Sequence, residues 1–142
     1  MGAVFVLCGI QGSGKTTLSH ILEKQYAAKR YSHDEMIEAD RLENAPFLKQ
    51  RMHKVAVEEL RKGHNVVLDA MYTTKNQRQQ ILSALANVPC KKILFLMDTP
   101  YEECLRRNAN RAKPIPRSAI EWTMFLYQPP ELSEGWDEIT IA

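Results

Sequence analysis

Eight consecutive residues near the N-terminus constrain this chain more than any other feature. Residues 9–16 read GIQGSGKT, which matches the phosphate-binding P-loop pattern G-x-x-x-x-G-K-[ST] in full. The apolar run at residues 3–8 ends directly before the loop, as a buried parallel strand does, and residues 17–24 follow with helical periodicity. Because a strand, the loop and a helix in this order are the context that the motif requires, we predict a nucleotide-binding P-loop.

The chemistry of such a loop assigns roles to its residues. Glycines let the backbone wrap around a phosphate chain with its N–H groups turned inward, and the helix N-terminus adds partial positive charge. Lys15 is expected to contact the outer phosphates, and the Thr16 hydroxyl is expected to hold Mg²⁺. An ordinary glycine-rich turn is the alternative, but it leaves the flanking strand and helix unexplained. The residues expected to bind nucleotide are Gly9, Gln11, Gly12, Ser13, Gly14, Lys15, Thr16 and Thr17.

Length and composition limit the class of protein. With 142 residues, 44% of them hydrophobic and 25% charged, the chain fits one globular domain over residues 1–142. A net charge of +2 is too small to indicate nucleic-acid binding by itself. Three widely spaced cysteines show neither metal-ligand nor disulfide spacing, which suits a reducing cytoplasm. No apolar run approaches the ~18 residues of a membrane span, and the N-terminus lacks signal-peptide features. We therefore expect a cytoplasmic protein without a membrane partner.

Strand and helix patterns alternate along the rest of the chain. Apolar runs predict strands at residues 30–32, 65–69, 92–98 and 136–141, and helical periodicity predicts helices at 35–42, 47–62, 75–87, 100–110 and 117–127. Thr74 is expected to cap one helix and Thr99 another, with Pro100 in its first position and Glu102 completing a capping box. Such alternation implies right-handed crossovers and a doubly wound parallel sheet with helices on both faces, an α/β fold.

Carboxylates follow three of the predicted strands. Asp34, Asp69 and Asp98 each lie at or just after a strand end, where ligands of parallel sheets bind. Asp69 ends an apolar strand in the pattern typical of a Walker B acid, which orients Mg²⁺ or its water shell. Capping of the following turn is the alternative for Asp69. Asp34 could accept the proton of an attacking hydroxyl, and its alternative is a helix N-cap, a role that Ser32 could also fill.

Arginines gather near one predicted helix end. Arg107 and Arg111, beside Arg106, are four residues apart and would share a helix face. Two guanidinium groups on one face can clamp a transferring phosphoryl group. The alternative is a solvated basic helix end, which the helix dipole favours. The four histidines show no metal-ligand spacing, although His33 neighbours Asp34.

At these residues the chain resembles the kinase domain of bacteriophage-type polynucleotide 5′-hydroxyl kinases and the wider P-loop kinase group that includes zeta toxins. The P-loop matches without departure. Other similar stretches are residues 31–35 (the strand ending in Arg-Asp-Asp), residues 68–72 (matched only at Asp69), residues 104–111 (the lid helix Arg-Asn-x-x-Arg), residues 114–116 and the tail at 128–139. The resemblance implies a P-loop NTPase fold, a five-stranded sheet of order 2-3-1-4-5, and a small helical lid at about 106–116. It also implies Asp34 as the general base and Arg107 and Arg111 as ligands of the ATP phosphates.

Two departures from this family concern the acceptor. Ile37 stands where the family has an arginine that contacts nucleic-acid phosphate, and His33 stands where it has the arginine before the base. Arg41 lies one helical turn beyond Ile37 and could take over the contact. His33 and Arg41 are therefore the expected acceptor-binding residues.

The expected function is that of an ATP-dependent kinase, a phosphotransferase with an alcohol group as acceptor. Asp34, Lys15, Arg107 and Arg111 are its expected catalytic residues, with Mg²⁺ held by Thr16 and Asp69. The resemblance implies a 5′-hydroxyl of RNA or DNA as acceptor. The nearest alternative keeps this chemistry with a small-molecule hydroxyl, of a metabolite or an antibiotic. A nucleotide switch is the third alternative, but residues 74–77 (TKNQ) lack the aspartate of a guanine-reading motif.

Overall fold

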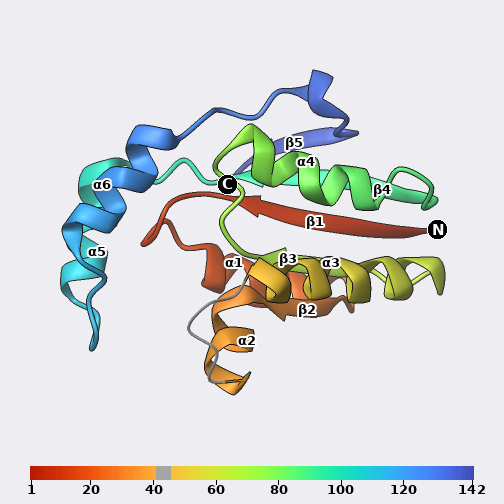
Figure 1. Cartoon of the computed structure of the whole chain (residues 1–142), viewed down its shortest axis with the longest axis horizontal. Helices are drawn as coiled ribbons and strands as arrows, with labels where there is room; N and C mark the ends of the chain where they lie inside the picture. The colour runs from red at the N-terminus through yellow and green to blue at the C-terminus, as the bar shows by residue number, and fades with distance from the viewer. Residues whose placement is uncertain (41–45) are drawn as a thin grey trace.

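Five parallel strands form one sheet in the computed structural model, which describes residues 1–40 and 46–142 (Figure 1). The strands are β1 (Gly2–Cys8), β2 (Lys29–Ser32), β3 (Val66–Asp69), β4 (Cys90–Leu96) and β5 (Glu138–Ile141). They pair in the order β2-β3-β1-β4-β5, and every pairing is parallel. The predicted α/β fold and strand order are confirmed. β1 is central, so the loop that follows it lies at the middle of the sheet edge.

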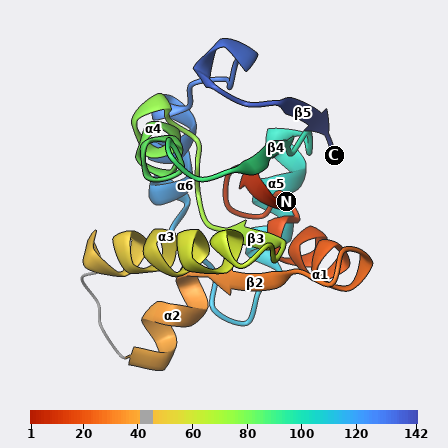
Figure 2. The same ribbon diagram turned by 90° about the vertical axis from the view of Figure 1, so that its right-hand side faces the viewer.

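Helices cover both faces of the sheet. Figure 2 shows α3 (Pro46–Arg61) and α4 (Lys75–Ala84) on one side and α1 (Lys15–Gln25) on the other. The remaining helices are α2 (His33–Asp40), α5 (Tyr101–Ala109), α6 (Arg117–Leu126) and the short 3-10 helix η1 (Leu132–Glu134). Among the described residues, no helix has both the length and the apolarity that a membrane span needs.

The alternation of side chains along β1 explains why its sequence is apolar throughout. Val4 and Val6 point to the face covered by α3 and α4, where they join the larger core cluster with Met52. Phe5 and Leu7 point to the opposite face, where they pack with Leu22 of α1 in a second cluster. A strand buried on both faces has no polar side, as the run at residues 3–8 predicted.

The capping prediction for α5 is wrong. Pro100 is the N-cap residue of this helix, and no side chain caps it. The Thr99 hydroxyl instead donates to the carbonyl oxygen of Ser13 at 2.8 Å. The hydroxyl that the local sequence pattern assigned to the helix cap therefore forms a hydrogen bond with the P-loop instead. By contrast, Thr74 caps α4, as predicted, and Gln77 completes a capping box with it.

Several helix boundaries also differ from prediction. The α5 helix ends at Ala109, so Arg111 lies beyond it and does not share a helix face with Arg107. The α4 helix ends at Ala84 rather than at 87, and α2 begins at His33, directly after β2. In α2 the backbone N–H of Glu35 donates to the Ser32 hydroxyl at 3.4 Å. Ser32 therefore has the capping role, and Asp34 lies within the first turn.

Candidate active site

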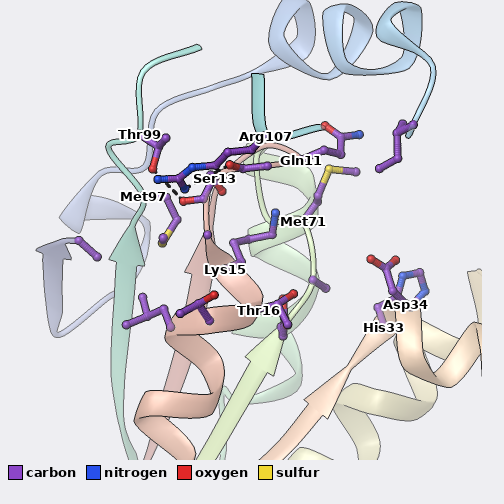
Figure 3. Close-up of a pocket in the computed structure, with 18 of the residues that line it drawn as sticks. Gln11, Ser13, Lys15, Thr16, His33, Asp34, Met71, Met97, Thr99 and Arg107 are labelled. Carbon is purple, nitrogen blue, oxygen red and sulfur yellow. Dashed lines mark hydrogen bonds between the residues drawn. The ribbon is translucent and has the colours of Figure 1, made fainter. Parts of the chain in front are cut away.

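A cleft of about 1290 Å³ lies at the carboxyl edge of the sheet. Its lining comes from the P-loop, the first turns of α1 and α2, α3, the segments after β3 and β4, and the lid that follows α5. Figure 3 shows Lys15 and Thr16 on one side of this cleft and His33 and Asp34 facing them from the other. The sheet thus brings together residues that are far apart in sequence.

Gly12 and Gly14 give the P-loop its shape. Both have positive φ, 82° and 96°, a conformation that side chains with a Cβ rarely adopt. A Cβ on Gly12 would also lie 2.5 Å from the carbonyl oxygen of Cys104, so α5 approaches the loop too closely for any other residue. The buried Ser13 hydroxyl and the buried Gln11 amide oxygen have no hydrogen-bond partner in the described structure. A loop that leaves buried polar atoms unpaired is suited to a polar ligand.

Lys15 lies within this loop and is held by it. Its Nζ donates to the carbonyl oxygens of Gly9 at 2.8 Å and Ile10 at 3.0 Å. Burial lowers the pKa of Lys15, while the carboxylates of Asp69 and Asp34 oppose that shift. Asp69 and Asp34 therefore both act electrostatically on the P-loop lysine. Their positions at strand ends predicted that they lie at the same edge of the sheet.

Asp69 is held by a group that the sequence did not reveal. Its Oδ2 accepts a hydrogen bond from Ser19 of α1 at 3.2 Å and pairs with Arg30 of β2 at 3.1 Å. The Arg30 side chain is 6% exposed, and it also pairs with Glu35 and donates to Ser19. Arg30 thus fixes one carboxylate oxygen of Asp69 and leaves Oδ1 without a partner among the described residues.

The residues at this position fit a magnesium ion bound mainly by phosphates. Mg²⁺ in phosphoryl-transfer sites keeps several waters and takes only one or two protein oxygens. Asp69 and the exposed Thr16 both line the cleft and would supply such oxygens. In the described part of the chain, no cluster of three His, Cys, Asp or Glu side chains could hold a metal without phosphate.

The α2 side of the cleft carries the predicted base. Asp34 is exposed, lies in the cleft lining and has no hydrogen-bond partner among the described residues. The neighbouring His33 has a buried Nε2 that is unpaired among the described groups. Ile37 lines the cleft one turn further along α2. Arg41, the other predicted acceptor-binding residue, lies outside the described residues.

The lid is organised by side-chain contacts within residues 103–115. Glu103 pairs with Arg107 at 3.1 Å and with Arg106, and these two guanidinium groups lower the pKa of Glu103 to about 2. The Arg107 Nη1 reaches the carbonyl oxygen of Gly12 at 3.5 Å. Asn108 is buried and forms two hydrogen bonds with the backbone of Ile115, which closes the loop between them. Arg107 and Arg111 both line the cleft, from the helix and from the closed loop, respectively.

The sequence analysis missed several cleft residues. Lys49 and Gln50 of α3, Met71 after β3, and Met97 and Thr99 after β4 all line the cleft. None of them belongs to a motif. In the sequence, Lys49 cannot be distinguished from the other polar residues of an amphipathic helix. Met71 and Met97 follow strand ends, and this position in the sequence could have indicated that they lie near a ligand.

Several solved structures, among them kinases, share this architecture. A sugar kinase from Janibacter sp. HTCC2649 superposes with a TM-score of 0.76 over 100% of this chain and 85% of that chain, at 16% identity. Kti12 from Chaetomium thermophilum, in complex with ADP-AlF3, gives 0.75 over 98% and 88%, at 19% identity. APS kinase from Mycobacterium tuberculosis, in complex with AMPPNP and APS, gives 0.67 over 99% and 88%, at 18% identity. At these identities the similarity establishes a kinase-like P-loop fold.

Sequence comparison gives one family and no individual relative. No curated protein sequence matches the chain significantly. A protein-family model described as "AAA domain" matches residues 4–130, from the first strand through the P-loop and the lid to the segment after α6. The match covers most of the 142 residues, and so the chain belongs to this AAA-domain family of P-loop proteins.

Proposed function

We propose that the protein is an ATP-dependent kinase that transfers the γ-phosphoryl group to a hydroxyl acceptor. The observation that carries this proposal is the position of Asp34, whose carboxylate has no partner in the described part of the chain and faces Lys15 and Thr16 across one cleft (Figure 3). A nucleotide switch needs the phosphate loop but has no use for a free carboxylate beside the outer phosphates. A kinase needs both, because the acceptor must lose a proton during transfer.

Positioning and charge stabilisation account for most of the catalysis in phosphoryl transfer. The P-loop N–H groups and Lys15 bind the β- and γ-phosphates, and Arg107 and Arg111 approach the same phosphates from the lid. Bound Mg²⁺, with Thr16 and Asp69 as its protein ligands, would neutralise charge on the β- and γ-oxygens. Arg30 contributes by fixing the orientation of the Asp69 carboxylate.

The proton of the acceptor goes to Asp34. The acceptor oxygen attacks the γ-phosphorus in line, a new P–O bond forms, and the bond to the β–γ bridging oxygen breaks. The Asp34 carboxylate accepts the hydroxyl proton, and ADP leaves with the electrons of the broken bond. The strand order separates the two substrates, since β2 and β3 lie on one side of β1 and β4 and β5 on the other.

The nucleoside end of ATP belongs on the β4 and β5 side. Leu18 and Ile21 of α1, Met97 after β4 and Ala142 after β5 line that end of the cleft. Ile21 is 52% exposed, and contact with a nucleobase would explain an apolar side chain there. The acceptor belongs on the other side, near Asp34.

Two acceptor classes have support. The resemblance of residues 31–35 and 104–111 to polynucleotide kinases favours a nucleic-acid 5′-hydroxyl. The sugar kinase and APS kinase among the similar structures favour a small hydroxyl compound. Ile37 also favours a small acceptor, because an apolar residue cannot pair with a nucleic-acid phosphate at that position.

Measurement of ADP release tests this function. Wild-type protein with ATP and Mg²⁺ is assayed against a panel of 5′-hydroxyl oligonucleotides, nucleosides, sugars and their phosphates. We expect release to rise with one acceptor class, and we expect Asp34→Asn to abolish the rise while ATP still binds. Turnover that no acceptor stimulates, and that Asp34→Asn leaves unchanged, would instead identify a nucleotide switch.

A further inference from the structure

Lys49 is a half-buried cation that lines the cleft, and no carboxylate of the described residues pairs with it. Its Nζ donates to the carbonyl oxygen of Met71 at 2.9 Å and lies 4.4 Å from the centroid of the Tyr72 ring. Within the described residues, no Asp or Glu oxygen lies within ion-pair distance of this ammonium group. An ammonium group has three N–H donors, so two remain for a ligand.

The surroundings of Lys49 offer polar groups, and none of the described carboxylates forms an ion pair with it. Tyr72 is fully buried, and its hydroxyl shares a hydrogen bond with Nε2 of His53 at 2.8 Å. Burial lowers the pKa of Lys49 to about 8 and that of His53 to about 4. His33, whose Nε2 is unpaired among the described groups, and Gln50 also line the cleft. A half-buried cation without an anion is costly, and a bound anion would remove that cost.

The position of Lys49 separates it from the groups that hold ATP. Lys49 lies on α3 and contacts the segment after β3, whereas the lid arginines follow β4. The P-loop follows β1, which lies between β3 and β4 in the sheet. An anion at Lys49 is therefore on the Asp34 side of the P-loop, where the acceptor hydroxyl must lie.

We propose that Lys49 binds a phosphate group carried by the acceptor, so that the enzyme selects phosphorylated hydroxyl compounds over neutral ones. The inference rests on the proposed kinase function, because it assigns the acceptor end of that site. A nucleotide or oligonucleotide and a sugar phosphate carry the same group, and the test separates them.

The first experiment measures anion binding without turnover. The P-loop is occupied by a non-hydrolysable ATP analogue with Mg²⁺, and inorganic phosphate is titrated into protein with isotope-labelled lysines. Lysine side-chain signals are followed by NMR, with Lys49 assigned from its absence in Lys49→Met. We expect the Lys49 signal to shift saturably, while the signal of Lys54, exposed on the same helix, stays unchanged. Equal behaviour of the two lysines would overturn the proposal.

The second experiment measures selectivity with acceptor pairs that differ by one phosphate. Suitable pairs are a nucleoside with its 3′-monophosphate and ribose with ribose 5-phosphate. We expect Lys49→Met, which keeps an apolar stem on the Tyr72 ring, to lower kcat/KM for the phosphorylated member by roughly 10- to 100-fold through KM. The neutral member, the KM for ATP and the thermal midpoint should not change, and Lys49→Arg should restore part of the loss. Lys54→Met is the matched control.

The outcomes separate this inference from the proposed function. Transfer that prefers neutral acceptors, with an unresponsive Lys49 signal, contradicts the phosphate site and leaves the kinase standing. A saturable Lys49 response without transfer to any acceptor supports the phosphate site and contradicts the kinase. The preferred pair identifies a nucleotide or a sugar phosphate as the source of the group.

Discussion

Lys15 is the residue that most directly tests the phosphate site. We expect Lys15→Met to lower kcat/KM for ATP-dependent transfer by ~10²–10³-fold, because a charge directed at the outer phosphates is lost. The variant should fold normally, since the side chain contacts only carbonyl oxygens of its own loop. Steady-state kinetics with thermal unfolding measures both effects, and Lys24→Met on the exposed last turn of α1 is the control. Normal kinetics in a folded Lys15→Met protein would exclude the P-loop from the reaction.

Asp34→Asn separates basicity from shape. A positioned general base typically contributes ~10²–10⁴-fold in rate, so we expect kcat to fall by that factor while the affinity for ATP stays unchanged. The asparagine keeps the size of the side chain and can remain in the first turn of α2. Single-turnover rates and nucleotide-binding titrations measure the two quantities. A kcat equal to that of the wild type would leave Asp34 as an ordinary exposed helix residue.

The pKa of His53 determines part of the pH dependence of folding stability. Burial, with the charges of Lys49 and His33, lowers its pKa from 6.5 to about 4. The folded state therefore binds fewer protons than the unfolded state, so stability is complete above pH 6.5 and falls as the pH drops from 6.5 toward 4.

The His53→Gln variant isolates this contribution to stability. We expect the wild type to lose about 1–3 kcal/mol more than His53→Gln between pH 7 and pH 4.5. Glutamine can still form a hydrogen bond with Tyr72 but does not titrate. Urea unfolding of both proteins at several pH values measures the difference. Parallel stability curves would show that His53 takes up its proton equally in both states.

At the scale of elements, the two ends of the lid differ in their contacts with the rest of the protein. The start of α5 contacts the P-loop through Gly12 and the hydrogen bond from Thr99 to Ser13. At the far end, residues 109–114 are exposed, and the hydrogen bonds of Asn108 with Ile115 close the loop. Arg107, which pairs with Glu103, and Arg111 bring two guanidinium groups to the cleft. We therefore expect phosphate to order this end of the lid.

Arg111 is the residue for testing the lid. If its guanidinium group grips phosphate oxygens in a bidentate geometry, both Arg111→Ala and Arg111→Lys lose kcat/KM, and lysine recovers only the charge. An effect on kcat identifies transition-state contact, whereas an effect on KM alone identifies ATP binding. Amide hydrogen exchange across residues 106–116 should slow when ATP binds. Unchanged exchange together with normal kinetics for Arg111→Ala would reduce the lid to a solvated basic surface.

At the scale of the whole molecule, one buried ion pair joins the C-terminal segment to the core. Arg78 of α4 is fully buried and pairs with Glu134 through two nitrogens, at 2.8 and 3.0 Å. The same guanidinium group donates to the carbonyl oxygens of Tyr72 and Gln128, both at 2.8 Å. Segments from three parts of the chain therefore depend on one side chain.

We expect Glu134→Gln to lower the free energy of unfolding by about 3 kcal/mol, since it leaves the Arg78 charge buried without its partner. Urea unfolding should show a lower midpoint with an unchanged m-value. Glu131→Gln, exposed and three residues earlier, is the matched control and should change little. If both variants unfold at the wild-type midpoint, water must reach Arg78 in the native state.

The sequence alone determined the features that depend on neighbouring residues. The P-loop, the apolar strands, the Thr74 cap and the alternation of strands and helices all follow from short-range patterns, and the structure agrees. The strand order came from resemblance and is confirmed. The roles of Asp34, Asp69, Arg107 and Arg111 remain predictions, although all four residues line one cleft.

Only the tertiary structure decided which polar groups meet across the sheet. Arg30 reaches Asp69 over a separation of 39 residues, and Arg78 reaches Glu134 over 56. Thr99 does not form its predicted helix cap, because its hydroxyl donates to the carbonyl oxygen of Ser13, 86 residues away in the sequence. Hydrophobic periodicity is a pattern within a single helix or strand. It therefore indicates only whether a position is buried. The partner of a buried polar group depends on how separate elements pack, and no local pattern records that.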